Sequence, residues 1–450
     1  MNETTGASQV GRGTADGRIL TLPSLSWALY DLGNTIFSMN IVSFFFSLWV
    51  VNVMGGTDSQ YGYTAALSYA IIFFLSPFLG ALTDQSPKRM PFLVVSTLVC
   101  VSFTFVLGTG GVSMSLAFFV VANIAYQSGL QFYDALLPEV STEANRGRVG
   151  GMGIGLGYLG SFIGLFTARW LLTGVDELGT VDEQSARFAL VFKVTAVLFL
   201  AFALPCFLFV RERARTRRFT IRAVPRAVGQ VAQTFRGIRR FPGLGRFLIG
   251  RVFYTDAVNT VIAFMGIYVT NEVGFSTEQS ILIMLVATAF AVPGGMVWGA
   301  VADRIGPKRT LDLVLYLWMV VFAWATIVGY FKLGQLSFWP VAVLAGLGLG
   351  GTWAADRPLM LRLTPPARIG EFYGLYNMVG RFSAVTGPFT WAFVAESISF
   401  RGMTFGLGLG RPAAVGALTL EIVIAWWILR HVSDAPRTWA KEDQAPVFRA

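Results

Sequence analysis

The stretch Gly80-Ala81-Leu82-Thr83-Asp84-Gln85-Ser86-Pro87-Lys88-Arg89 closes a long apolar run with a cluster of charges. A second copy follows later in the chain, as Gly299-Ala300-Val301-Ala302-Asp303-Arg304-Ile305-Gly306-Pro307-Lys308-Arg309. Both copies place a glycine four residues before an aspartate, and a Pro-Lys-Arg turn then leads into another apolar run. The two aspartates lie 219 residues apart, close to half of the 450-residue chain. The repeat therefore indicates a membrane protein built from two similar halves.

The composition also indicates a polytopic membrane protein. Hydrophobic residues make up 54% of the chain and charged residues 13%, outside the usual range of globular proteins. The mean hydropathy is +0.60. The net charge of +10 does not indicate a nucleic-acid partner, because the basic residues lie in short loops where they determine membrane topology. The only cysteines, Cys100 and Cys206, lie inside apolar runs, so we expect no disulfide framework.

Apolar segments of about 20 residues, the length that crosses a bilayer as a helix, recur along the chain. They predict twelve transmembrane helices, with the first tilted or bent near Asn40. The expected spans are 25–52, 62–83, 91–109, 113–137, 149–172, 188–210, 246–270, 277–301, 309–331, 338–362, 372–396 and 411–431. We therefore expect an all-α integral membrane protein with an N-terminal tail (1–23), two six-helix halves (24–210 and 246–431), a linker (211–245) and a C-terminal tail (432–450).

The basic residues predict the orientation of the helices. Loops after the second, fourth, sixth, eighth and tenth helices carry most of the Lys and Arg, whereas the opposite loops carry mainly acids. The positive-inside rule then places both termini in the cytoplasm and the protein in the cytoplasmic membrane. The linker holds ten arginines with apolar residues between them, which favours an amphipathic helix on the anionic inner leaflet. A flexible linker held inside by its charge is the simpler alternative.

Two further features repeat at nearly the same offset. Asp31-x-x-Asn34-Thr35 in the first helix matches Asp256-x-x-Asn259-Thr260 in the seventh, and Asp134 before Pro138 matches Asp356 before Pro358. Three matched features in one order indicate an internal repeat of six helices in parallel arrangement.

The chain resembles the major facilitator superfamily of transporters, in which the loop between helices 2 and 3 carries a stretch similar to Gly80–Arg89. Within that superfamily it resembles the vacuole-effluxer-like branch. The resemblance rests on Trp27-Ala28-Leu29-Tyr30-Asp31, Phe132–Pro138, Arg146–Gly151, Gly157–Gly160, Glu371–Tyr376, Gly380-Arg381 and Gly387-Pro388. It implies a twelve-helix fold of two pseudo-symmetric halves, with helices 1, 4, 7 and 10 around a central cavity.

Ionisable residues inside the predicted spans are the candidates for function, since a charge at the bilayer centre costs at least ~2.5–3.5 kcal/mol. Asp31 and Asp256 either handle substrate and protons or form ion pairs with Arg357 or Arg251 that lock a gate. Arg357 either binds a substrate anion or neutralises Asp134 or Asp31. Glu421 lies on a helix away from the cavity, where we expect an interfacial position. The expected cavity residues are Tyr30, Asp31, Asn34, Asp134, Tyr158, Asp256, Asn259, Trp353, Asp356, Arg357 and Tyr376.

The repeated stretch itself predicts a gate on the cytoplasmic side. We expect Gly80 and Gly299 to let helices 2 and 8 pack closely against helices 11 and 5 of the opposite half. Asp84 and Asp303 would then pair with Arg381 and Arg148 as a latch that stabilises an outward-facing state. The expected gate residues are Gly80, Asp84, Lys88, Arg89, Arg148, Gly299, Asp303, Arg304, Lys308, Arg309 and Arg381.

These features predict a secondary active exporter of small organic solutes, amino-acid-like or otherwise amphiphilic. We expect it to work as a monomer in the lipid bilayer by alternating access, driven through carboxylates by a proton or cation gradient, with no cofactor. The sequence shows no catalytic constellation and no metal-ligand cluster, so an enzyme is not expected. The alternatives are an importer, a lipid, drug or siderophore transporter of the same fold, and a non-transporting membrane sensor or assembly factor.

Overall fold

The computed structural model describes residues 19–56, 58–173, 180–212, 241, 243–275, 277–395, 398–400, 403–405, 407–435 and 439. The predicted linker falls largely on residues outside this set, as does most of each predicted tail. The described chain consists of long helices and one short hairpin.

In the described residues before the linker, eight α-helices and two π-helical stretches form one group, which we call the N-bundle. They are α1 (Leu22–Phe37), η1 (Ser38–Phe44), α2 (Phe45–Leu48), η2 (Trp49–Val53), α3 (Asp58–Asp84), α4 (Met90–Phe105), α5 (Gly111–Asp134), α6 (Leu137–Val140), α7 (Arg146–Leu171) and α8 (Val181–Phe209). The first four follow one another without a break. The π-helical stretch η1 includes Asn40, the residue where the sequence predicts a bend.

The elements after the linker form the second group, which we call the C-bundle. They are α10 (Leu244–Tyr268), η5 (Val269–Val273), α11 (Thr277–Ile305), α12 (Pro307–Tyr330), η6 (Gln335–Phe338), α13 (Trp339–Leu363), η7 (Pro366–Arg368), α14 (Ile369–Ala395), β1 (Ile398–Phe400), β2 (Met403–Phe405) and α15 (Arg411–Leu429). The antiparallel hairpin β1–β2 pairs Ser399 with Thr404 and was not predicted from the sequence.

Ten helical segments in the described part of the chain are long and apolar enough to cross a membrane. Two further helices fall outside those ten: α4 is a shorter apolar helix, and α14 has 27 residues. The chain is therefore an all-helical membrane protein, and the count of twelve spans stays a prediction.

Local sequence explains where several helices begin. Thr21 caps α1 in a reciprocal arrangement with Ser24, in which each side chain accepts the other residue's backbone N–H, so two of the free donors of the first turn are satisfied. Proline stands in the first turn of α4, α12, α13 and α15, where its missing N–H costs no hydrogen bond. Gly306 before α12 has a φ of 92°, which a residue with a side chain rarely adopts.

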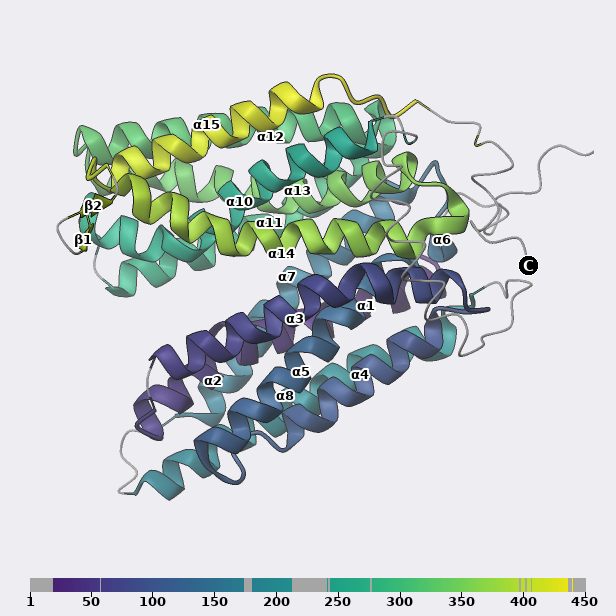
Figure 1. Cartoon of the computed structure of the whole chain (residues 1–450), viewed down its shortest axis with the longest axis horizontal. Coiled ribbons are helices and arrows are strands. Elements are labelled where there is room, and N and C mark those ends of the chain that lie inside the picture. The colour runs from purple at the N-terminus through teal and green to yellow at the C-terminus, as the bar shows by residue number, and fades with distance from the viewer. Residues whose placement is uncertain are drawn as a thin grey trace, which may run out of the picture.

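The two bundles lie side by side, close together at the end where α6 lies and diverging toward the end where β1 and β2 lie (Figure 1). Contacts between the bundles join α3 to α14 and α7 to α11. A Cβ at Gly80 would collide with the carbonyl oxygen of Gly370, and one at Gly299 with that of Gly147. Glycine thus permits the close approach of these helices. The helix pairing is the one that the repeated stretch predicts, and we call this end of the molecule the latch end.

Candidate functional site

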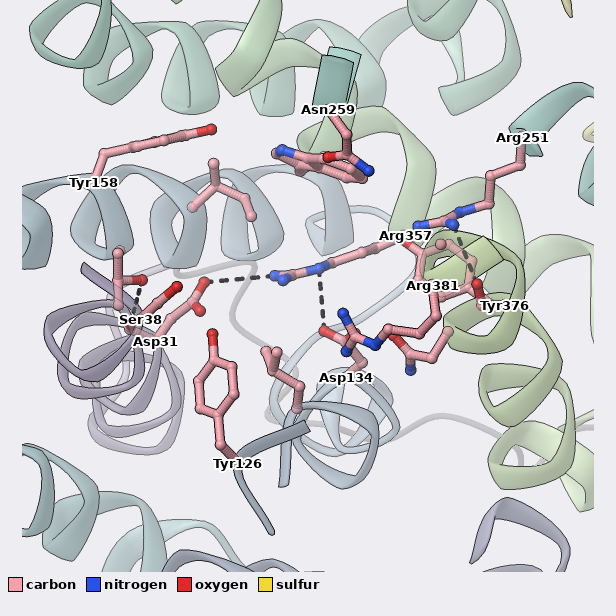
Figure 2. A pocket seen from close by; sticks show the side chains of 17 residues that line it. Asp31, Ser38, Tyr126, Asp134, Tyr158, Arg251, Asn259, Arg357, Tyr376 and Arg381 are labelled. Atoms are coloured by element: carbon pink, nitrogen blue, oxygen red, sulfur yellow. Dashed lines mark hydrogen bonds and ion pairs between the residues drawn. The ribbon is translucent and has the colours of Figure 1, made fainter. Parts of the chain in front are cut away.

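A cavity of about 370 Å³ lies between the two bundles, and we call it the central cavity. Figure 2 shows its polar side chains, which come from both bundles and point toward one another. It is lined by Asp31, Thr35, Ser38, Tyr126, Leu130, Asp134, Ile154, Gly157, Tyr158, Arg251, Asn259, Trp353, Arg357, Tyr376, Asn377, Gly380 and Arg381.

Arg357 on α13 joins the two bundles at the centre of this cavity. Its Nε lies 3.1 Å from Asp134 Oδ1 on α5, and its Nη1 lies 3.6 Å from Asp31 Oδ2 on α1 (Figure 2). All three side chains are buried. One guanidinium therefore serves two carboxylates, and the contact with Asp31 is longer than a hydrogen bond. We call this group the Arg357 cage.

A second ion pair lies entirely within the C-bundle, and we call it the Arg251–Asp356 network. Arg251 Nε lies 3.1 Å from Asp356 Oδ2. The hydroxyls of Tyr254 and Tyr376 donate to the same carboxylate at 2.7 and 2.8 Å. The Arg251 guanidinium also donates to the Tyr376 carbonyl at 3.1 Å and stacks 3.5 Å from its ring centroid. Asp356 is fully buried and well supplied with donors, as a stable buried charge requires.

Arg381 on α14 is a third cation of the central cavity. Its guanidinium lies 5.9 Å from the ring centroid of Tyr69, and it forms no ion pair with any acid in the described part of the chain. The sequence placed Arg381 at the gate beside Asp84. That expectation is wrong, because Arg381 lies three turns into α14 and faces the cavity (Figure 2).

Asp84, at the last residue of α3, contacts the N-bundle and the C-bundle together. Its carboxylate accepts the backbone N–H groups of Gly370 and Glu371 at 2.9 and 2.8 Å, and Arg89 Nη2 lies 2.7 Å from its Oδ1. Arg89 also donates to the Ala135 carbonyl at 3.2 Å. The first turn of α14 thus receives an anion where its N–H groups lack helical partners.

Asp303 on α11 repeats this arrangement on the other side of the interface. Its carboxylate accepts the backbone N–H groups of Gly147 and Arg148 at 2.6 and 3.0 Å, and Arg148 Nε donates to it at 2.8 Å. In both copies the aspartate binds the second and third residues of a helix that belongs to the opposite bundle. The internal repeat is therefore visible in the contacts as well as in the sequence.

Among the described residues, no ion pair between the bundles involves the remaining expected gate residues. Lys308 is buried and pairs at 2.6 Å with Asp312 on its own helix, because they stand one turn apart. Lys88, Arg304 and Arg309 are exposed side chains at the latch end.

Four expected cavity residues do not line the central cavity. Tyr30 packs inside the N-bundle, with its ring stacked 5.0 Å from Tyr133 and its hydroxyl 2.9 Å from Thr97 Oγ1. Asn34 is buried away from the cavity, although Asp31 lines it. Asp356 lies behind the lining, within the network just described. The fourth, Asp256, has other partners.

Asp256 on α10 faces α14 instead of the cavity. Thr386 Oγ1 on α14 donates to Asp256 Oδ1 at 2.5 Å. The expected interfacial position of Glu421 stays a prediction; its Oε2 is buried and has no hydrogen-bond partner in the described part of the chain. Asn259, one turn after Asp256, does line the cavity.

Sequence reasoning missed several lining residues, among them Ser38, Tyr126 and Asn377. Ser38 lies about two turns after Asp31 and Tyr126 about two turns before Asp134, so helical spacing was the available indication, whereas Asn377 directly follows Tyr376. In the described part of the chain no three His, Cys, Asp or Glu side chains gather as metal ligands would.

Comparison with known proteins identifies what this chain is similar to. Residues 48–401 match the family described as "Vacuole effluxer Atg22 like". A relative from Bacillus subtilis (strain 168), described as the uncharacterized MFS-type transporter YxiO, is 28% identical over 93% of this chain and 96% of its own length. Autophagy-related protein 22 of Yarrowia lipolytica is 22% identical over 61% of this chain, which spans only 50% of that protein.

Solved structures show the same fold. The transporter FucP of the major facilitator superfamily, in its outward conformation, has a TM-score of 0.74 at 10% identity, covering 92% of this chain and 98% of FucP. A bacterial homologue of the iron transporter ferroportin in an outward-facing state has a TM-score of 0.68 at 13% identity, with 92% and 98% coverage.

Proposed function

Since the chain belongs to the vacuole effluxer Atg22-like family and is a membrane transporter of the MFS type, we propose that it exports small organic solutes by alternating access. The observation that carries this proposal is the Arg357 cage, an ion pair that spans the two bundles inside a cavity. Opening and closing of the bundles around such a site would break and remake it. The cavity volume lies at the lower end of the ~300–1,000 Å³ usual for small-molecule sites.

The geometry of the latch end supports an outward-facing state. Two aspartates and two glycine contacts hold the bundles together there. The basic loops lie at this end, so we assign it to the cytoplasm and place both termini on that side of the cytoplasmic membrane. The halves 24–210 and 246–431 would then move as two bodies joined by the basic linker.

The charges of the central cavity suggest what the solute carries. The Arg357 cage has two carboxylates and one guanidinium, so it attracts a proton, a cation or a substrate ammonium group. Arg357 already pairs with Asp134 and Asp31, so Arg381 is the guanidinium of the cavity that can bind an anionic group of the solute. Aromatic side chains of Tyr126, Tyr158 and Trp353 add apolar surface. An amino-acid-like or amphiphilic solute fits this combination.

The energy for export would come from an ion or proton gradient, without a cofactor. The protein would act as a monomer, because substrate site and latch contacts all lie within one chain.

Two experiments test the proposal. A thermal-shift screen of the purified full chain against amino acids, peptides, sugars, siderophores and drugs should find a class of solute that raises Tm. At 100-fold excess over Kd, such a solute stabilises the folded protein by about 2.7 kcal/mol. That class should then show counterflow in proteoliposomes, and Asp31→Asn should abolish it while Asp312→Asn, outside the cavity, should not. Absence of both Tm shifts and counterflow for every class would refute transport of such solutes.

A further inference from the structure

We infer that Glu212 is a positioning residue that ties the start of the linker to the contact between Asp84 and α14, which we call the latch contact. The inference rests on the proposed function, because the latch contact matters for transport only if the bundles separate at the latch end. Glu212 is the second residue of the predicted linker, and its side chain is buried.

The first step is a hydrogen-bonded contact between Glu212 and the start of α4. Glu212 Oε2 accepts the backbone N–H groups of Arg89 and Met90 at 2.5 and 2.9 Å. Arg89 is the N-cap residue of α4, and its own side chain forms no capping hydrogen bond. The first N–H groups of a helix have no partner within the helix, so an acceptor from elsewhere stabilises them. Glu212 therefore supplies the missing cap from a position 123 residues away.

The second step leads from α4 to the opposite bundle through the side chain of Arg89. This side chain is 1% exposed, and its Nη2 lies 2.7 Å from Asp84 Oδ1. Asp84 in turn accepts the first N–H groups of α14. Arg89 Nη1 also donates to the Ala135 carbonyl at 3.2 Å, directly after α5. A guanidinium that serves two fixed acceptors needs a fixed backbone, and Glu212 holds that backbone.

The third step is a comparison with the C-bundle, which repeats the cap without the connection to the other bundle. Asp434, after α15, stands 222 residues after Glu212, close to the 219 that separate the two copies of the repeated stretch. Asp434 Oδ2 accepts the backbone N–H of Lys308 at 3.0 Å in the first turn of α12. The Lys308 side chain, however, pairs with Asp312 on its own helix, and in the described part of the chain it forms no ion pair with Asp303. The internal repeat thus offers a matched control for Glu212.

Two matched variants of the full chain in lipid test the inference. Glu212→Ala and Asp434→Ala each remove an acceptor at a helix start, so both should lower Tm. The conformation is read from Leu130→Cys in the central cavity, labelled by an impermeant maleimide added on the cytoplasmic side. Labelling should become about 2- to 30-fold faster in Glu212→Ala, the change in population that the loss of a cap permits, and should keep the wild-type rate in Asp434→Ala. Equal rates in the two variants would overturn the inference.

A conservative variant separates positioning from a general loss of stability. Glu212→Gln keeps an oxygen that can accept the two N–H groups, so labelling should return toward the wild-type rate. A rate as fast as that of Glu212→Ala would contradict the hydrogen-bonded cap as the cause.

A double variant separates this inference from the latch itself. Asp84→Ala combined with Glu212→Ala should label no faster than Asp84→Ala alone, because both changes act on one chain of contacts and are not additive. Faster labelling in Asp84→Ala with an unchanged rate in Glu212→Ala would refute the role of Glu212 and keep the latch contact. An unchanged rate in both single variants would refute the latch contact as well.

Discussion

Asp356 and Arg357 are neighbours in the sequence, yet they belong to two differently built ion pairs. The Arg251–Asp356 network lies within one bundle, and its carboxylate receives a guanidinium and two tyrosine hydroxyls. The Arg357 cage crosses between the bundles, shares one guanidinium between two carboxylates, and leaves Asp31 at 3.6 Å. The Arg251–Asp356 network is therefore built to stabilise the C-bundle. The Arg357 cage is placed where a movement of the two bundles would break it. Four substitutions test this distinction.

Asp356→Ala should have the largest effect on stability. It leaves Arg251 buried without its carboxylate, and removing one partner of a buried pair costs about 3–5 kcal/mol. Thermal unfolding in detergent should show a large drop in Tm or no folded protein. Asp312→Ala, which breaks a pair between adjacent turns of α12, should change Tm far less. Equal Tm values for the two variants would remove the distinction.

Asp31→Asn should leave the protein folded and stop transport. The substitution keeps the shape, and Asp134 still neutralises Arg357, so the expected change in unfolding free energy is within about 1 kcal/mol. Counterflow of the best substrate should fall about tenfold or more, because the cage loses its second carboxylate. Transport at the wild-type rate across about pH 5–8 would show that the cage only holds the bundles together.

Asp84→Ala should shift the resting population toward an inward-facing state. It removes an anion from the first turn of α14, a change comparable to the loss of a helix cap, about 0.5–2 kcal/mol. A cysteine introduced at Leu130, which lines the central cavity, should then react faster with a reagent added on the cytoplasmic side. Unchanged labelling would count against the latch. Asp303→Ala should act in the same direction, because its contacts are equivalent.

Glu272→Gln should have the smallest effect. Glu272 lies beyond the membrane span of α10, 2.7 Å from Lys332 Nζ and 3.2 Å from Arg411 Nη1. Partial burial raises its pKa, but these two cations outweigh burial and hold the pKa below its ordinary value. The pairs therefore stabilise the protein above the unfolded pKa of about 4.3, and this contribution is lost as pH falls through the lower folded pKa. At about pH 7 the variant should lose only ~0.2–1 kcal/mol, measured as a small drop in Tm that disappears near pH 3.

The sequence was sufficient for the helices and for the pairing of α3 with α14 and of α11 with α7, because both depend on local features, but not for the partner of Asp84. Apolar length predicts spans, and a glycine before an aspartate predicts close packing of two helices. The sequence also predicted Asp134 and Asp31 as alternative partners of Arg357. These predictions need only the spacing of residues along the chain. They do not need the rotation of each helix about its own axis.

The cavity residues were harder to predict because a repeat does not fix the rotation of each helix. Asp31 and Asn34 match Asp256 and Asn259, but the aspartate lines the cavity on α1 and the asparagine lines it on α10. Positions three residues apart differ by only about 60° around a helix axis, so a small rotation exchanges them. Asp256 instead accepts a hydrogen bond from Thr386 on α14, a contact between helices that no spacing in the sequence indicates.

The most direct test of the central claim is a pair of spin-label distances measured in lipid. One pair, at Lys88→Cys and Arg304→Cys, reports the latch end of the two bundles. The other, at Thr173→Cys and Leu336→Cys, reports the opposite end; all four positions are exposed. With the solute that gives the largest Tm shift, the first distance should lengthen in part of the population while the second shortens. Two distances that stay fixed, or that change in the same direction, would contradict alternating access around the Arg357 cage.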